Sequence, residues 1–135
     1  MKTVMISLLM AAAAASAAHA ETCADAENAV RVSAAQGHAL VTQMDDIRNQ
    51  HSTTQWSIAM EQKALDDYGW DPETEDYIDE LQDALAVLER RWNALNDELI
   101  KIDPVVRVAL QTYETACGAE ANTPALLSEL GLNPG

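Results

Sequence analysis

The sequence predicts an all-α fold: a long antiparallel helical hairpin, coiled-coil-like, stapled by a terminal disulfide and followed by a short C-terminal helix. Three features support this prediction: an apolar heptad stripe, a turn signal at residues 69–71, and one cysteine on either side of that turn. Glycine and proline are scarce between residues 24 and 116, where the helix-forming residues Ala, Leu, Glu, Gln, Met and Arg dominate. No alternating pattern typical of strands competes with the helical one.

The beginning of the chain has the features of a secretory signal peptide. Lys2 supplies a positive start, residues 4–15 form an apolar run, and residues 18–20 (Ala-His-Ala) form a small-x-small cleavage site. The apolar run is too short to span a bilayer, and Cys23 does not directly follow the cut, as a lipid anchor would require. We therefore predict that residues 1–20 are a signal peptide, that the mature chain is periplasmic or secreted, and that no stable membrane insertion follows cleavage.

The chain is strongly acidic, with 22 Asp and Glu against 8 Lys and Arg and a formal net charge of −14. Cleavage after residue 20 removes the positive charge of Lys2, which makes the mature chain more negative by one charge. A surface this acidic repels phosphate backbones and anionic lipid surfaces, and the longest basic run is only Arg90-Arg91. We therefore expect no nucleic-acid partner.

The two cysteines, Cys23 and Cys117, enclose nearly the whole mature chain. In an exported chain of this size they favour a disulfide, with two separately buried thiols as the alternative. Residue 70 lies midway between them, so helices that run from each cysteine to a turn at 69–71 have equal lengths. Folded antiparallel, such helices bring both sulfur atoms to one end. The sequence therefore predicts a hairpin over residues 21–117.

The second predicted helix carries the clearer apolar stripe. Its residues recur at intervals of three and four: Ile78, Leu81, Leu85, Leu88, Trp92, Leu95, Leu99 and Ile102. Asp103-Pro104 would normally end a helix, yet the same count continues without a shift to Ala116. We therefore predict one continuous helix that is kinked at Pro104, with a break at this point as the alternative.

The first predicted helix carries a weaker stripe in a single phase. Its positions are Val30, Ser33, Gly37, Leu40, Met44, Ile47, His51, Thr54, Ile58, Glu61, Leu65 and Tyr68. The segment HSTT, residues 51–54, contains good N-cap residues, but the count passes through it unshifted. The main structural alternative is a four-helix up-down bundle with turns at 51–54, 69–71 and 103–104. Its segments would differ too much in length to pack well side by side.

The predicted turn has a helix-stop signal followed by a helix-start signal. Gly69 stands where a helix C′ glycine belongs, and residues 71–73 (Asp-Pro-Glu) have the pattern of an N-cap, a first-turn proline and an acid. The acid-rich stretch 66–80 also suggests a calcium loop, but frames that begin at Asp66 or at Asp71 both fail the EF-hand ligand spacing. We interpret the stretch as a turn with a solvated acidic surface; a weak divalent-cation site of low specificity is the alternative.

Residues 118–135 predict a loop and a short helix. Thr123 is placed as the N-cap, Pro124 at the first helical position and Gly131 just past the end. The helix carries three leucines, Leu126, Leu127 and Leu130. It either folds back on the base of the hairpin or serves as a docking peptide for a partner.

The chain has more apolar side chains than the seam between two helices uses. Trp56 and Met60 lie one turn apart on the outer face of the first helix, and further residues lie off the seam of the second: Val87, Ile100, Val105 and Val108. We therefore expect an exported, non-catalytic protein-interaction module: an adaptor, an inhibitor or a holdase-like chaperone. The predicted interaction surface comprises Trp56, Met60, Val87, Leu126, Leu127 and Leu130. Its partner is another protein or a second copy, which would give a homodimeric four-helix bundle.

A ligand-binding role is the alternative. Met44 and His51 lie two turns apart on one stripe, and such a pair can hold copper or a haem iron in a small-ligand, haem or metal-binding bundle. The simpler interpretation is a gap-filling methionine and a histidine with a local hydrogen bond. No nucleophile motif, phosphate loop or haem-attachment motif is present, so we expect no enzyme activity and no cofactor. A purely structural spacer is a third possibility.

Overall fold

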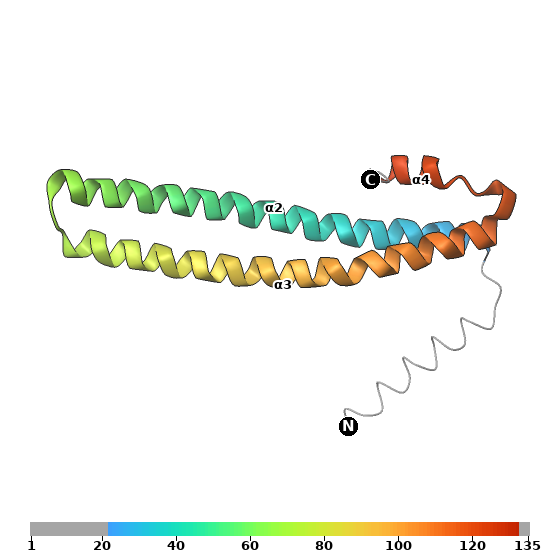
Figure 1. The fold of residues 1–135 in the computed structure, drawn as a ribbon, viewed down its shortest axis with the longest axis horizontal. Coiled ribbons are helices and arrows are strands. Elements are labelled where there is room, and N and C mark those ends of the chain that lie inside the picture. The colour runs from blue at the N-terminus through green and yellow to red at the C-terminus, as the bar shows by residue number, and fades with distance from the viewer. Residues whose placement is uncertain (1–21, 133–135) are drawn as a thin grey trace, which may run out of the picture. The chain divides into compact units, whose positions relative to one another are not determined.

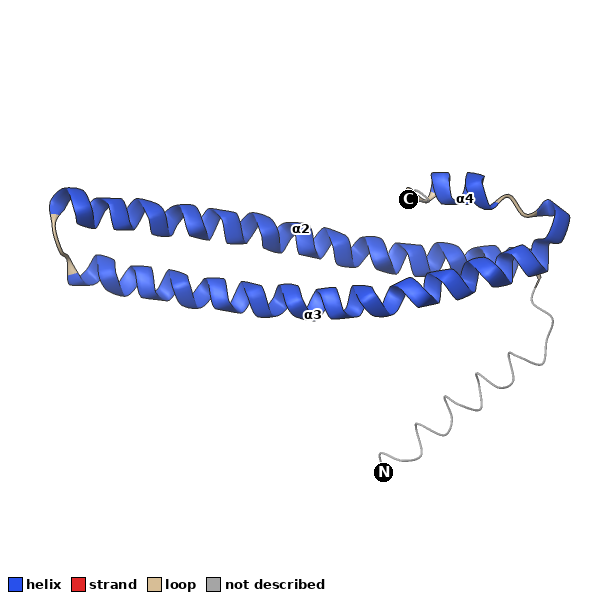
Figure 2. Ribbon diagram, in the orientation of Figure 1, coloured by secondary structure: helices blue, strands red, loops and turns tan. Residues whose placement is uncertain are grey.

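The structure, a computed structural model, describes residues 22–132 and contains two long helices. Helix α2 (Cys23–Tyr68) and helix α3 (Pro72–Cys117) are packed together in antiparallel directions (Figure 1). A 3₁₀ turn, η1 (Gly118–Glu120), leads to the short helix α4 (Thr123–Glu129), and the described range contains no strand (Figure 2). These elements confirm the predicted hairpin with its short C-terminal helix. The predicted signal peptide lies outside the described residues and stays a prediction.

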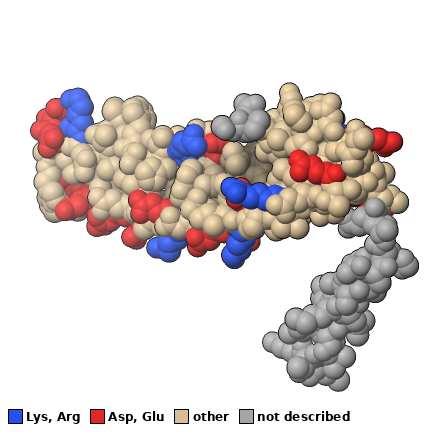
Figure 3. Space-filling view, turned by 45° about the vertical axis from the view of Figure 1, so that its right-hand side comes forward, with Lys and Arg blue, Asp and Glu red and all other residues tan. Residues whose placement is uncertain are grey.

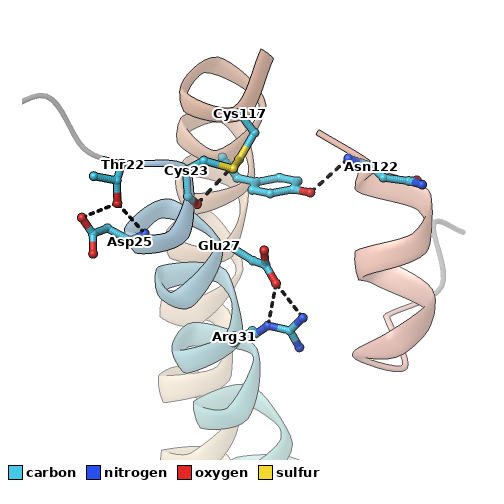
Figure 4. The surroundings of a disulfide bond; sticks show 8 residues. Thr22, Cys23, Asp25, Glu27, Arg31, Cys117 and Asn122 are labelled. Atoms are coloured by element: carbon cyan, nitrogen blue, oxygen red, sulfur yellow. Dashed lines mark hydrogen bonds and ion pairs between the residues drawn. A yellow bond between two sulfur atoms is a disulfide. The ribbon is translucent and has the colours of Figure 1, made fainter. Parts of the chain in front are cut away.

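Helix α2 begins at a side-chain cap and continues without a break to Tyr68. The backbone N–H of Asp25 donates to Thr22 Oγ1 over 3.1 Å (Figure 4), which satisfies one of the free N–H groups at the helix start. In the HSTT segment, the hydroxyls of Thr53 and Thr54 donate to backbone carbonyls four residues earlier, over 3.0 and 2.9 Å. These hydroxyls bond within one helix and do not cap a new one, so the four-helix alternative is wrong.

The turn between α2 and α3 uses the residues that the sequence indicates. Gly69 has a φ of 93°, which favours glycine, and its N–H donates to the carbonyl of Leu65 over 2.9 Å. Asp71 Oδ2 accepts from the Thr74 hydroxyl over 2.6 Å and from the Thr74 N–H over 3.1 Å. The hydroxyl bond first, and the N–H bond second, lower the pKa of Asp71 because they stabilise the carboxylate. Gly69 therefore ends α2 and Asp71 caps α3, as predicted.

Helix α3 passes through Pro104 without interruption, which confirms the predicted continuity. Pro104 has no N–H to donate, so the carbonyl of Ile100 loses its helical partner. Asp103 and Arg107 form an ion pair across the same turn at 2.9 Å. The predicted stripe is buried or half-buried at each of its positions from 78 to 116. Burial of this unshifted stripe, and not the proline, decides the structure here.

The chain divides into two compact units, and both long helices run through each of them. Of the described residues, 22–31 and 108–132 belong to the base unit, and Val32–Arg107 form the turn unit. In the base unit, α2, α3 and α4 surround a core of buried residues: Ala26, Val30, Tyr113, Cys117 and Leu126. The turn unit consists of α2 and α3 only, and most of its seam residues are half-buried. A third helix therefore closes the core of the base unit, whereas the seam of the turn unit stays partly open.

Helix α4 is held on the base unit by hydrogen bonds as well as by apolar packing. Tyr113 Oη accepts from the backbone N–H of Asn122 over 3.0 Å. Arg31 donates two hydrogen bonds to the Glu129 carboxylate, over 2.9 and 3.0 Å, and also pairs with Glu27 at 2.7 Å (Figure 4 shows the second pair). The hydrogen bonds from Arg31 lower the pKa of Glu129, because they stabilise its charged form. Of the two roles considered for the tail, the structure shows the one in which it folds back on the base of the hairpin.

Helix α4 is capped one residue earlier than predicted. The N-cap is Asn122, whose Oδ1 accepts from the Ala125 N–H over 3.2 Å, and Thr123 is the first helical residue. The Thr123 hydroxyl instead donates to Glu114 on α3 over 2.9 Å. Asn and Thr are both good N-caps, and this tertiary hydrogen bond decides between them. At the other end, Gly131 has a φ of 66° and takes the predicted C′ role.

The predicted disulfide joins Cys23 at the start of α2 to Cys117 at the end of α3 (Figure 4). The two Cα atoms are 4.6 Å apart, within the range that disulfides require. Cys117 is buried in the core of the base unit, and the pair spans a sequence separation of 94. Both cysteines of the chain are therefore used, and the alternative of two separate thiols is wrong.

Gly37 occupies a seam position in the interior of α2, where glycine weakens a helix. A Cβ at Gly37 would lie 3.7 Å from Ile102 Cγ2, an ordinary van der Waals distance. We therefore expect Gly37→Ala to raise the free energy of unfolding by about 0.5–1 kcal/mol. Urea unfolding followed by far-UV circular dichroism measures this change. Gly69→Ala, the same change at a positive φ, is the control and should lower stability; an unchanged Gly37→Ala would contradict the prediction.

Candidate interaction surface

Two contacts fix how α2 and α3 face each other in the turn unit. Gly37 lies beside Ile102, and His51 Nε2 lies 3.7 Å from Glu89 Oε1. Residues on the two helices whose numbers sum to about 140 are therefore opposite each other across the seam. This register places each exposed side chain of one helix beside known residues of the other.

Two flanks border the seam, and the first is defined by Arg48 and Glu89. Each of these residues directly follows a seam residue, and the Arg48 guanidinium lies over the Trp92 ring, 5.8 Å from its centroid. Each residue turns an α-helix by about 100°, so residues that directly precede a seam residue lie on the opposite side, which we call the second flank. The two flanks of the turn unit therefore differ in which residues they display.

Three of the predicted surface residues lie exposed in the turn unit: Trp56 is 65%, Met60 47% and Val87 45% exposed. Met60 and Val87 directly precede seam residues and belong to the second flank, while Trp56, one turn before Met60, lies on the outer face of α2 next to this flank. Further residues of this flank complete a surface that we call the apolar patch. It is made of Trp56, Met60, Ala64, Tyr77, Ala84 and Val87. The register sets residues 56–64 beside residues 76–84, so the patch extends across both helices.

The aromatic residues near the turn depart from the sequence-based expectations. Tyr77 is 46% exposed in the patch and was not predicted there, although its place directly before the seam residue Ile78 is a signal that it lies on the second flank. Tyr68 was assigned to the seam but is 90% exposed, because it is the last residue of α2 and only the first residue of α3, Pro72, lies opposite it. Trp70 is also exposed, and its Nε1–H donates to Glu75 Oε2 over 2.6 Å.

The α3 side of the apolar patch lies in an acidic part of the chain, whereas Trp56 and Met60 lie in a stretch without Asp, Glu, Lys or Arg. Residues 49–60 contain no Asp, Glu, Lys or Arg, whereas residues 61–89 contain eleven acidic residues and one basic residue. That basic residue, Lys63, forms an ion pair with Asp67. Figure 3 shows acidic and basic side chains along the left and central part of the lower edge. The patch therefore borders a largely acidic stretch of α3, which ends at Arg90 and Arg91.

A pocket of about 420 Å³ lies on the first flank. Its lining residues are Ile47, Arg48, His51, Leu88, Glu89, Trp92 and Asn93. The ligand candidate His51 contributes to this pocket, whereas Met44 is buried in the seam and does not. Among residues 22–132, no three His, Cys, Asp or Glu side chains come together in a way that would hold a metal ion. The pocket therefore offers an apolar floor with an arginine, a histidine and a carboxylate at its rim.

The tail leucines do not form the exposed surface that the sequence predicts. Leu126 is 4% exposed and belongs to the core of the base unit, while Leu127 and Leu130 are half-buried. Leu126 is buried because α4 packs on the other two helices of that unit. The predicted interaction surface is corrected accordingly, and its exposed members are the three residues of the turn unit.

Helices α2 and α3 each contain 46 residues, but charged side chains recur along both of them. Over the described part of the chain, no helix combines the length and the apolar content that a membrane crossing requires.

Comparison of the chain with protein-family models, with curated proteins and with solved structures found no match.

Proposed function

We propose that the chain is an exported, non-catalytic helical protein-interaction module that acts as an adaptor, an inhibitor or a holdase-like chaperone. The apolar patch carries this proposal, because its four large side chains are each at least 45% exposed. Trp, Tyr and Met are enriched at the centres of protein interfaces, and apolar side chains gathered in one place mark interaction sites more often than scattered ones do. The patch thus has the composition of a protein-binding surface.

The incomplete core of the turn unit also supports a partner. Leu81 and Leu85 in its seam are only half-buried, because two helices alone bury a narrow strip of each other. In the base unit, where a third helix is present, Val30 is fully buried. A partner on the second flank would cover the apolar patch and these seam residues together. Burial of both would then stabilise the complex through the hydrophobic effect.

Export and the absence of catalysis rest on separate observations. The disulfide supports export, because such bonds form and persist in oxidising compartments, and the predicted signal peptide agrees with it. A non-catalytic role is supported by the use of both cysteines in that bond and by a pocket whose lining includes His51 but no Ser, Thr or Cys.

Replacing Trp56 and Met60 together with alanine is expected to remove association through this surface. Truncating a central interface tryptophan commonly costs 2 kcal/mol or more, which is about 30-fold in affinity. Val41→Ala/Ile100→Ala is the matched control, since both residues are exposed and lie on the first flank. Native mass spectrometry of the three proteins, exported by the same host, compares copy number and co-purified partners.

All four replaced side chains are exposed, so circular dichroism should show the same helix content and the same unfolding midpoint in every variant. If Trp56→Ala/Met60→Ala leaves both self-association and partner capture unchanged, the apolar patch is not the site of interaction.

Binding of a small ligand, haem or metal is the second candidate function, favoured by the presence of His51 in the pocket. It predicts that the purified protein shows visible absorbance or a bound metal, and that His51→Ala removes this signal. Met44 would contribute only from within the seam, so Met44→Ala should have the smaller effect on binding. A purified protein that has neither absorbance nor metal removes the haem and metal forms of this function.

A further inference from the structure

We propose that the apolar patch binds a basic amphipathic helix of a partner protein, an inference that rests on the proposed function of this surface. On α2, Trp56, Met60 and Ala64 follow one another at intervals of four, so they form a ridge along the helix. On α3, Tyr77 and Ala84 are two turns apart and border the same seam from the other side. A groove between two such helices accepts a third helix, the usual way in which an amphipathic helix is recognised.

Side-chain size along this flank agrees with a helical occupant. Small residues lie next to the seam, with Ser57 and Ala64 on α2 and Ala84 on α3. They leave room for a third backbone to approach, while Tyr77, Met60 and Val87 on the same flank are larger. The apolar face of an incoming helix would therefore meet small residues beside the seam, with larger apolar side chains around them.

The base unit shows the effect of a third helix on a pair of helices. With α4 packed on α2 and α3, Ala26 and Val30 are each 0% exposed. In the turn unit, where α2 and α3 pack alone, Ile47 and Leu88 are buried but Leu81 and Leu85 stay half-buried. A partner helix packed on α2 and α3 would bury seam residues of the turn unit, as α4 buries residues of the base unit.

Charge decides which kind of helix fits. Residues 61–91 carry eleven acidic and three basic residues; Lys63 is paired with Asp67, and Arg90 and Arg91 end the stretch beyond Val87. Glu80 and Asp83 lie on α3 within the stretch that carries the patch, and both are exposed. Lysines and arginines beside the apolar face of a partner helix would be attracted to these carboxylates, which speeds association and selects against acidic partners.

The same charges argue against the other occupants. Two copies that meet patch to patch would bring two such acidic regions together, in a chain whose formal net charge is −14. An anionic lipid surface would be repelled for the same reason. A basic amphipathic helix is the occupant that can both cover the apolar patch and attract the nearby carboxylates.

Isothermal titration calorimetry of the full mature protein, with its disulfide intact, tests this inference. The probe is a synthetic amphipathic helix of leucine and lysine, and the matched probe has the same leucine pattern with glutamate in place of lysine. We expect the first peptide to bind and the second not to bind. Trp56→Ala/Met60→Ala should weaken binding at least about tenfold, whereas Val41→Ala/Ile100→Ala should bind as the wild type does.

Two further variants, each lacking two negative charges, separate local from overall electrostatics. Glu80→Gln/Asp83→Asn changes acids in the stretch that carries the patch, and Asp97→Asn/Glu120→Gln changes acids outside residues 61–89. We expect only the first variant to weaken binding of the leucine–lysine peptide and to reduce its salt dependence. Equal weakening by both would mean that net charge alone attracts the peptide, which would overturn the inference.

The remaining outcomes distinguish this inference from the proposed function. No binding of the leucine–lysine peptide, or equal binding of the leucine–glutamate peptide, rules out a basic helix as the partner. If the wild type then self-associates in sedimentation and Trp56→Ala/Met60→Ala does not, the occupant is a second copy and the proposed function stands. If that variant alters neither peptide binding, self-association nor partner capture, both proposals fall.

Discussion

Replacing both Cys23 and Cys117 with alanine is expected to lower the free energy of unfolding by about 4 to 5 kcal/mol. The bond spans a sequence separation of 94, and a crosslink over a loop of this length strongly restricts the unfolded chain. Small domains are stable by only about 5–15 kcal/mol in total, so the disulfide supplies a large share. Urea unfolding followed by far-UV circular dichroism measures the loss.

Reduced wild-type protein provides the control for this experiment. It should unfold at a urea concentration close to that of Cys23→Ala/Cys117→Ala and well below that of the oxidised protein, and the variant itself should not respond to reductant. Alanine also leaves a small gap at Cys117, which is buried, so the variant is expected to be slightly the less stable of the two. A double variant as stable as the oxidised wild type would show that loop closure contributes nothing.

Leu126→Ala is expected to cost about 2–4 kcal/mol and to release α4 from the base unit. Leu126 is 4% exposed in the core of that unit, and α4 has only 7 residues, too few to remain helical without packing. The pair between Arg31 and Glu129 is exposed at the surface, so it cannot hold α4 in place by itself. Amide hydrogen exchange should show loss of protection in α4, and urea unfolding should show the loss of stability.

Leu127→Ala removes the same atoms from the next residue of the same helix. Leu127 is half-buried and is not part of the core of the base unit, so its replacement should have a clearly smaller effect. Equal losses of protection in the two variants would indicate that α4 is held by general apolar contact and not by the burial of Leu126.

The long-range architecture was predictable because several independent patterns agree. The unshifted apolar count through Pro104 predicted a continuous α3, and burial of the stripe on both sides of the proline explains why the helix continues. Gly69 and Asp71 were recognisable from their residue types, and each takes its predicted role through a hydrogen bond to a residue three or four positions away. The cysteine pairing was inferred from the presence of two cysteines in a chain expected to be exported, and the equal distances of Cys23 and Cys117 from that turn agree with it.

The features that sequence did not predict depend on contacts between segments that are distant in the chain. Thr123 has the residue type of an N-cap, but its hydroxyl bonds to Glu114 on α3, and Asn122 caps the helix instead. Leu126 looked equally suited to an exposed docking surface and to a core, and only the placement of α4 on the base unit decides. Local patterns cannot distinguish such cases because both outcomes satisfy the same local preferences.

The candidate surface was predicted in part. Trp56, Met60 and Val87 were recognisable as residues outside the seam, but the flank they share follows from the register of α2 against α3. That register also adds Tyr77 to the apolar patch, where its exposed ring is accessible to a partner. The acidic surroundings were visible in the sequence, yet their meaning depends on the apolar patch that they enclose.

The covalent link between the ends of the hairpin also determines how the molecule bears mechanical load. Tension applied at the two ends of the chain would pass through the Cys23–Cys117 bond and leave residues 24–116 slack. A force applied at the turn would instead pull on the paired helices. The part of the oxidised protein between Cys23 and Cys117 therefore extends little when the chain ends are drawn apart, and reduction of the bond exposes the helix pair to the force.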